Sequence, residues 1–311
     1  MTAISVPKIL VPLTITDDML VSSSVPEPDA GETAWVSGGT YVGGDIRIRA
    51  TTHRKYMAQT NHTGITTPPE NDPTRWLDVG ATNRWAMFDP RRTTQTTAAT
   101  SITVVLKPGF FNALAFYLTQ GATLQVSVLD APLGTEIYAD TRSLDGPYID
   151  EYDWCWGPFR EQTKQVFSNI LPYPEATLTI TVSASAGTPV AVGMAAIGDL
   201  RPLFLGEWGG TQYGAKAEPT SNSYIKTDTF GDTTIIKRAS ATDMRLSVVF
   251  PKDDADYALS CLQEVLDTPA AIIATEASGY SGLNIFGLIS GPVSYDGPSH
   301  ATIEAQVKGL F

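Results

Sequence analysis

The stretch Ser101–Leu106, which reads SITVVL, decides the fold class of this 311-residue chain. Hydrophobic and polar side chains alternate along it, so one face of an extended strand can pack on a core while the other meets water. Thr177–Ser183 (TLTITVS) and Thr123–Leu129 (TLQVSVL) also have the composition and length of strands. Similar short runs recur between Gly, Pro, Asn and Asp residues, which is typical of an all-β chain. We therefore predict a mainly β protein.

Further strands are predicted over Val190–Ile197, Asp243–Phe250 and Thr302–Val307. One clear helix is predicted over Asp253–Asp267, because its apolar residues recur at three- and four-residue spacings. That apolar stripe consists of Ala258, Leu259, Leu262, Val265 and Leu266. Arg160–Ile170 is too short for its apolar spacing to distinguish a short helix from a strand.

The length exceeds that of a typical single domain, and changes in composition divide the chain into four parts. We expect an N-terminal arm (1–33), a small aromatic β-hairpin module (34–90), a β-sandwich (91–205) and a C-terminal α+β assembly domain (206–311). The threonine-rich stretch Arg91–Thr100 is the expected linker. Pro7 and Pro12 are expected to prevent a regular central strand in the arm. Its apolar residues then need cover from a neighbouring subunit or from the chain's own C-terminal domain.

The chain is acidic, with 21 Lys and Arg against 33 Asp and Glu and a formal charge of −12. This charge argues against nucleic acid or an anionic membrane surface as the main partner. The longest apolar runs are too short to cross a bilayer, so we expect no membrane insertion. We expect no disulfide framework from the two distant cysteines, Cys155 and Cys261, and the N-terminus is a poor secretory signal.

Four aromatic residues, Trp35, Tyr41, Tyr56 and Trp76, form the densest feature of the sequence. Exposed Trp and Tyr faces can receive the apolar C–H face of a sugar, while flanking polar groups bind its hydroxyls. The other interpretation is that these rings are the core of the module, because its few aliphatic residues cannot stabilise it alone. Trp85 is expected to pack against the neighbouring domain.

The spacing of these aromatics and of intervening small residues resembles the chitin-binding type module of carbohydrate-binding families five and twelve, as used in phage tail proteins. The residues that carry the likeness are Trp35, Tyr41, Gly44, Asp45, Tyr56, Ala58, Gly64, Pro69 and Trp76. The run Asp72–Asp89 is similar to a stretch of tailed-phage tail-tip proteins, and the opening Ile15–Leu20 and closing Ile303–Leu310 fit that picture. The middle of the chain looks like a galactose-binding-type jelly roll. The specific motifs lie within Trp35–Asp89.

This resemblance implies a structural component of a phage tail tip or baseplate that contributes to host-surface glycan binding. It implies a virion protein assembled in the host cytoplasm, with other tail proteins and host glycan as partners. Together with the apolar arm, tail symmetry makes a homo-oligomer, a trimer or a hexamer, the expected state. Its carbohydrate-binding residues are then Trp35, Tyr41, Tyr56 and Trp76. The alternatives are a structural brace without a ligand and a tail-borne polysaccharide hydrolase.

A second aromatic and acidic stretch covers Asp145–Trp156. Its carboxylates Asp145, Asp150 and Asp153 are calcium candidates, because calcium prefers oxygen ligands in loops. The favoured interpretation is a solvated acidic loop that Trp154 and Trp156 pin to the sandwich, without cofactor. The same loop offers aromatic platforms for a ligand as a further alternative.

The familiar enzyme signatures are absent. The sequence has no G-x-S-x-G elbow, phosphate loop or H-E-x-x-H motif, and its three histidines lack metal-ligand spacing. We therefore expect a protein that is not an enzyme.

Overall fold

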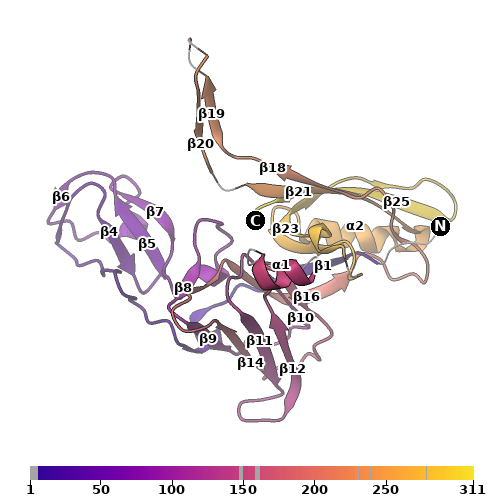
Figure 1. The fold of residues 1–311 in the computed structure, drawn as a ribbon, viewed down its shortest axis with the longest axis horizontal. Coiled ribbons are helices and arrows are strands. Elements are labelled where there is room, and N and C mark those ends of the chain that lie inside the picture. The colour runs from indigo at the N-terminus through magenta and orange to yellow at the C-terminus, as the bar shows by residue number, and fades with distance from the viewer. Residues whose placement is uncertain are drawn as a thin grey trace.

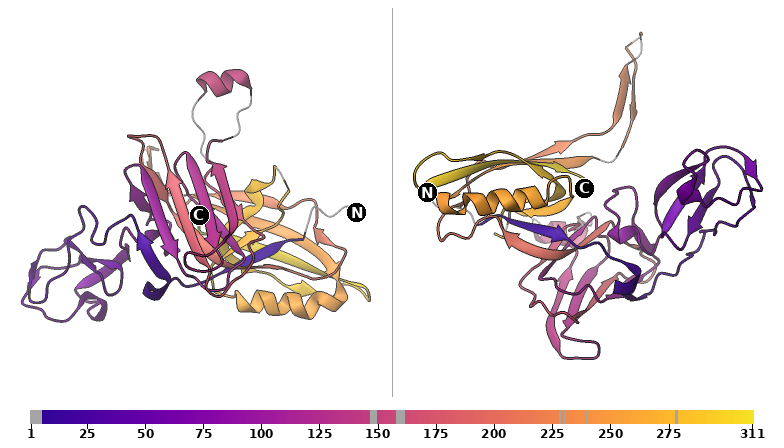
Figure 2. Two further views of the ribbon diagram at one scale, coloured as in Figure 1. Left: turned by 90° about the horizontal axis from the view of Figure 1, so that it is seen from below. Right: turned by 180° about the vertical axis from the view of Figure 1, so that it is seen from behind.

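A computed structural model describes residues 6–146, 150–157, 162–227, 229, 231–238, 240–277 and 279–311 (Figures 1 and 2). The chain is 44% strand and 11% helix, with several antiparallel sheets, so the predicted mainly β fold is confirmed. Short 3₁₀ turns lie at Asp17–Met19, Pro69–Asn71, Ala86–Phe88, Lys252–Asp254 and Ser281–Leu283.

The largest sheet curls into a half-barrel and runs through the middle and C-terminal parts of the chain. Its strands, in spatial order, are β13 (Gln165–Phe167), β10 (Ala113–Tyr117), β16 (Met194–Pro202), β1 (Lys8–Pro12), β22 (Ala270–Ile273), β23 (Asn284–Ser290), β25 (His300–Gly309), β21 (Ala241–Pro251) and β17 (Gly210–Thr211). Two further strands join its edge region, β18 (Lys216–Thr220) beside β21 and β24 (Val293–Ser294) beside β25.

Strand β1 lies at the centre of this sheet, so the expectation that prolines exclude the arm from a central strand is wrong. Ile9 is paired with Arg201 of β16 on one side and with Ile272 of β22 on the other. Pro7 precedes the strand and Pro12 is its last residue, so the missing N–H groups fall at its ends. The arm is therefore covered by the chain's own sheet, and it needs no neighbouring subunit for this purpose.

A second, five-stranded sheet packs on the β10, β13 and β16 end of the large sheet. Its strands are β12 (Glu136–Ser143), β11 (Thr123–Leu129), β14 (Thr177–Ser183), β9 (Ser101–Leu106) and β2 (Leu20–Ser23). Strands β9, β11 and β14 have the bounds that the sequence predicted. Their inward residues, such as Ile102, Val126 and Ile180, are fully buried against Leu114 and Phe116. The predicted two-layer sandwich is thus present.

Helix α2 (Ala255–Glu264) covers the other end of the large sheet, where Ala258, Leu262 and Val265 are buried. The sequence predicted this helix over Asp253–Asp267, and the structure ends it at Glu264. The chain then forms turns and takes a left-handed φ of 60° at Asp267, which stops the helix before Pro269. Two residues of the predicted apolar stripe are exposed: Leu259, within the helix, and Leu266, beyond its end.

The aromatic module lies at one end of the molecule (Figure 1). It contains a three-stranded sheet of β4 (Ile46–Arg49), β5 (Arg54–Ala58) and β7 (Trp76–Ala81), and the short pair β3 (Thr40–Tyr41) and β6 (His62–Thr63).

The stretch Arg91–Thr100, expected to be a linker, is instead part of the packed structure. It contains β8 (Thr96–Ala98), which pairs with β15 (Val190–Val192). Thr96 is fully buried, and its hydroxyl accepts a 2.8 Å hydrogen bond from the Met87 N–H. The predicted strand Val190–Ile197 is interrupted at Gly193, where any Cβ would meet the Leu118 side chain at 2.7 Å.

Two elements stand away from the packed sheets. Helix α1 (Glu151–Trp156) extends from the sandwich in the left view of Figure 2. The hairpin of β19 (Tyr224–Thr227) and β20 (Thr233–Ile236) projects from the C-terminal part in Figure 1. In the undecided segment Arg160–Ile170, the described residues include strand β13, while residues 160 and 161 lie outside the described part.

Candidate functional site

Three of the four predicted sugar-binding aromatics form the core of the small module. Tyr41, Tyr56 and Trp76 are only 4%, 6% and 2% exposed. The Trp76 ring meets Tyr41 edge to face, with 5.0 Å between centroids, and His62 packs against both rings. A sugar stacks on an exposed ring face, and these three rings have none. Their positions therefore fit the interpretation that these rings are the core of the module.

The glycine-rich turn before β3 explains the position of Tyr41. The Tyr41 hydroxyl donates to the Val36 carbonyl at 2.7 Å and accepts from the Val36 N–H at 2.8 Å. A Cβ on Gly39 would lie 2.7 Å from the Tyr41 hydroxyl oxygen, so only glycine fits beneath the ring. The ring thus closes the turn as well as filling the core.

Trp35 is the predicted site residue that retains some accessible surface. It is half-buried beside the other aromatics, and the Arg49 guanidinium lies 5.0 Å from its ring centroid. Glu70 holds Arg49 through an ion pair of 3.0 Å. One side of Trp35 is therefore covered by a fixed cation, which leaves a partial platform at the module surface.

A buried carboxylate joins the module to the rest of the chain. The Glu27 side chain, 4% exposed, accepts hydrogen bonds from Thr82 Oγ1 at 2.7 Å and from Trp85 Nε1 at 3.1 Å. His53 Nδ1 lies 3.0 Å from the same carboxylate, and its ring stacks on Trp85 with 4.3 Å between centroids. Trp85 accordingly packs where the module meets its neighbour, and we call this cluster of four residues the neck.

The aromatic residues that are open to solvent lie on α1. Tyr152, Trp154 and Trp156 are 74%, 68% and 78% exposed. The expectation that Trp154 and Trp156 pin an acidic loop to the sandwich is therefore wrong. The segment instead forms a short helix, because the Asp150 carboxylate caps it by accepting from the Asp153 N–H at 2.7 Å. The backbone of α1 lies clear of the sheets (Figure 2).

Sequence reasoning did not predict this helix, although a signal for it was present. Asp150 is a favoured N-cap residue, and Glu151 and Asp153 suit the first turn of a helix. Tyr152 and Trp156 are four residues apart, so they are neighbours on one side of α1. Residues 147–149 of the same segment lie outside the described part.

The calcium candidates Asp145, Asp150 and Asp153 do not combine into a metal site in the described part of the chain. Among those residues, no group of three or more His, Cys, Asp or Glu side chains is arranged to hold a metal ion. The Asp150 carboxylate already serves as the cap of α1.

Comparisons with known proteins do not assign the chain to a family. No protein-family model, curated protein or solved structure matches the chain.

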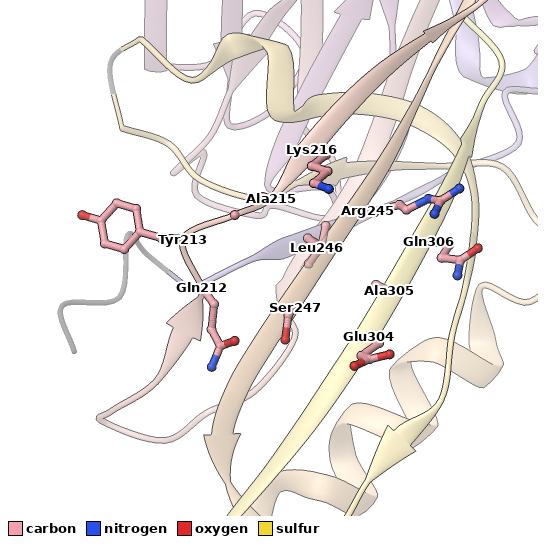
Figure 3. Close-up of a pocket in the computed structure, with 11 residues that line it drawn as sticks. Gln212, Tyr213, Ala215, Lys216, Arg245, Leu246, Ser247, Glu304, Ala305 and Gln306 are labelled. Atoms are coloured by element: carbon pink, nitrogen blue, oxygen red, sulfur yellow. The ribbon is translucent and has the colours of Figure 1, made fainter.

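A groove of about 320 Å³ opens on the face of β21 and β25 that lies opposite α2 (Figure 3). Its lining combines Lys216, Arg245 and Glu304 with Gln306 and the exposed Tyr213. Charges of both signs lie along this open surface.

A second hollow, of about 410 Å³, lies between β13 and the segment that precedes β23. It includes Lys164, whose ammonium donates to the Asn284 carbonyl at 3.0 Å. Burial, with a smaller contribution from the nearby Arg92 cation, lowers the pKa of Lys164. The hydrogen bond to the backbone gives this lysine a structural partner.

The described helices are all too short or too polar to cross a membrane.

Proposed function

We propose that this chain is a structural component of a phage tail tip or baseplate that contributes to host-surface glycan binding. The phage setting is supported by the sequence resemblance over Trp35–Asp89. The glycan contact is supported by one observation above all, the exposure of Tyr152, Trp154 and Trp156 on α1. The aromatic platform is thus assigned to the sandwich, with Trp35 as a smaller surface on the module.

The surroundings of these rings favour a neutral or amino sugar. Sugars combine apolar C–H faces with hydroxyl groups, and α1 combines exposed rings with the carboxylate of Glu151. Carboxylates accept hydrogen bonds from hydroxyls, whereas their charge repels acidic polysaccharides and anionic lipid.

A purely structural brace without a ligand is the second candidate. The burial of Tyr41, Tyr56 and Trp76 favours it, because the module's aromatics are used for packing. In that case the module spaces or orients neighbouring tail proteins.

Binding to polysaccharide separates the two candidates. The purified chain should co-sediment with insoluble chitin or with host-envelope polysaccharide, and Tyr152→Ala/Trp156→Ala should weaken this binding. The expected loss is about 1–3 kcal/mol for two stacked rings. Trp208→Ala is the matched control, since Trp208 is 49% exposed but lies outside α1. Absence of wild-type binding to both polymers would favour the brace.

The position of the chain in phage particles tests the proposed phage setting independently of any ligand. Antibody against this chain should label one end of the tail in electron micrographs of purified particles. Particles without copies of the chain would contradict the tail-component proposal, whatever the polysaccharide result.

A further inference from the structure

The hairpin of β19 and β20 has no packing partner in the described part of the chain. All eight of its strand residues are exposed, and so are the five residues of β18 that lead into it. Its two strands pair only with each other, and it extends well beyond the sheets in Figure 1. An isolated two-stranded hairpin is marginally stable in water, so a supporting surface is expected.

Both faces of the hairpin carry large apolar side chains. The strand register pairs Tyr224 with Ile236 and Ile225 with Ile235, and successive pairs point to opposite faces. These four side chains are 48%, 53%, 62% and 57% exposed, respectively. Each face of the hairpin therefore offers an exposed apolar surface for docking.

The charge of the hairpin is opposite to that of the remaining chain. Residues 221–240 contain three basic and two acidic side chains, whereas the other residues contain 18 basic and 31 acidic ones. The three cations are Lys226, Lys237 and Arg238, and within the described part none of them forms an ion pair. A basic, apolar projection on an acidic molecule is complementary to another copy of that molecule.

We propose that the hairpin of one copy docks onto the acidic body of a second copy. Two hairpins placed side by side would bring their cations together, so the body is the favoured receiving surface. Such a contact joins two different surfaces, which produces a ring or a filament of copies. The inference deepens the proposed structural role by naming its partner. Its tests measure self-association without glycan or virions, so their failure is distinguishable from failure of the proposed function.

Removal of the hairpin is the first test. Thr220 and Ala241 are already a cross-strand pair, so an Asn-Gly turn can join them in place of residues 221–240. The wild-type chain should form oligomers in sedimentation at micromolar concentration, and the shortened chain should be a monomer with an unchanged melting temperature. A monomeric wild-type chain, or oligomers that survive the removal, would overturn the proposal.

Substitution of the apolar pairs keeps the hairpin and removes its hydrophobic surface. Ile225→Thr/Ile235→Thr/Ile236→Thr retains β-branched residues and should weaken self-association about tenfold or more. Ile46→Thr is the matched control, because Ile46 is 49% exposed on a strand of the module. Equal association of the triple variant and the wild type would contradict docking through these faces.

Charge reversal tests the choice of partner. Lys226→Glu/Lys237→Glu/Arg238→Glu should weaken self-association in low salt and have a smaller effect in high salt, because salt screens exposed charges. A reversal that leaves low-salt association unchanged would exclude the acidic body as the receiving surface. A wild-type monomer that binds DNA or anionic vesicles through the hairpin would also overturn the proposal.

Discussion

The module and helix α1 have similar aromatic and acidic sequences but opposite structures. In the module, Tyr41 and Trp76 are enclosed by strands and by each other, whereas Trp154 and Trp156 of α1 lie in solvent. The two regions differ in how many residues surround the aromatic rings. About fifty residues fold over the module's aromatics, while α1 is a single six-residue helix whose aromatic side chains are exposed. Identical residue types therefore stabilise one region and form the outer surface of the other.

Trp76→Ala should have the largest effect on stability. Trp76 is the most buried ring of the module, and its loss leaves a cavity worth about 3–5 kcal/mol in a unit with few other apolar residues. Limited proteolysis should then cut within residues 34–90 while the two large sheets remain folded. A module that resists protease as well as the wild type would show that Trp76 is not its core.

Glu27→Gln should destabilise the neck by about 1–3 kcal/mol, because the new amide N–H₂ opposes one of the donors on Thr82 and Trp85. Thermal unfolding followed by Trp fluorescence measures the change. Glu136→Gln is a control on the exposed strand β12, and its effect should be close to zero. Equal effects of the two substitutions would refute a structural role for the neck.

Acid should weaken the module. Hydrogen bonds from Thr74 and Arg75 lower the pKa of Asp72, so the folded module favours the carboxylate form. This contribution is complete above the unfolded pKa near 3.9 and is lost as pH falls through the lower folded value. The expected loss is about 1 kcal/mol once the carboxylate is protonated in the folded module. Asp72→Asn should remove this part of the acid dependence, measured by module unfolding between pH 5 and pH 2; an unchanged dependence would contradict it.

Tyr152→Ala/Trp156→Ala should have the smallest effect on stability, within about 0.5 kcal/mol, because both rings are largely exposed. Chemical denaturation compares this variant with Trp76→Ala. A loss of stability near that of Trp76→Ala would mean that α1 is packed against the chain in solution. It would contradict the contrast between buried rings in the module and exposed rings on α1.

Several features could be predicted from local patterns alone. The alternation in Ser101–Leu106 and Thr177–Ser183 predicted the correct bounds of β9 and β14. These strands belong to a sheet with one buried face and one more exposed face, so their side chains alternate in the same way. The apolar stripe of α2 gave its position, since Ala258 and Leu262 need the same buried face. Local sequence patterns predicted less of the candidate site. Aromatic spacing located the module but did not distinguish rings that pack from rings that bind.

The sequence by itself therefore determined several of the extended segments, the position of the amphipathic helix α2, and that the chain is acidic and rich in β-structure. These properties depend on neighbours within a few residues. Only the tertiary structure decided that β1 is a central strand between β16 and β22, that Trp76 is buried, and that Trp156 and the β19–β20 hairpin are exposed. Each of these features depends on contacts between segments that are distant in the sequence. The residues next to a side chain in the sequence do not determine how many strands surround it.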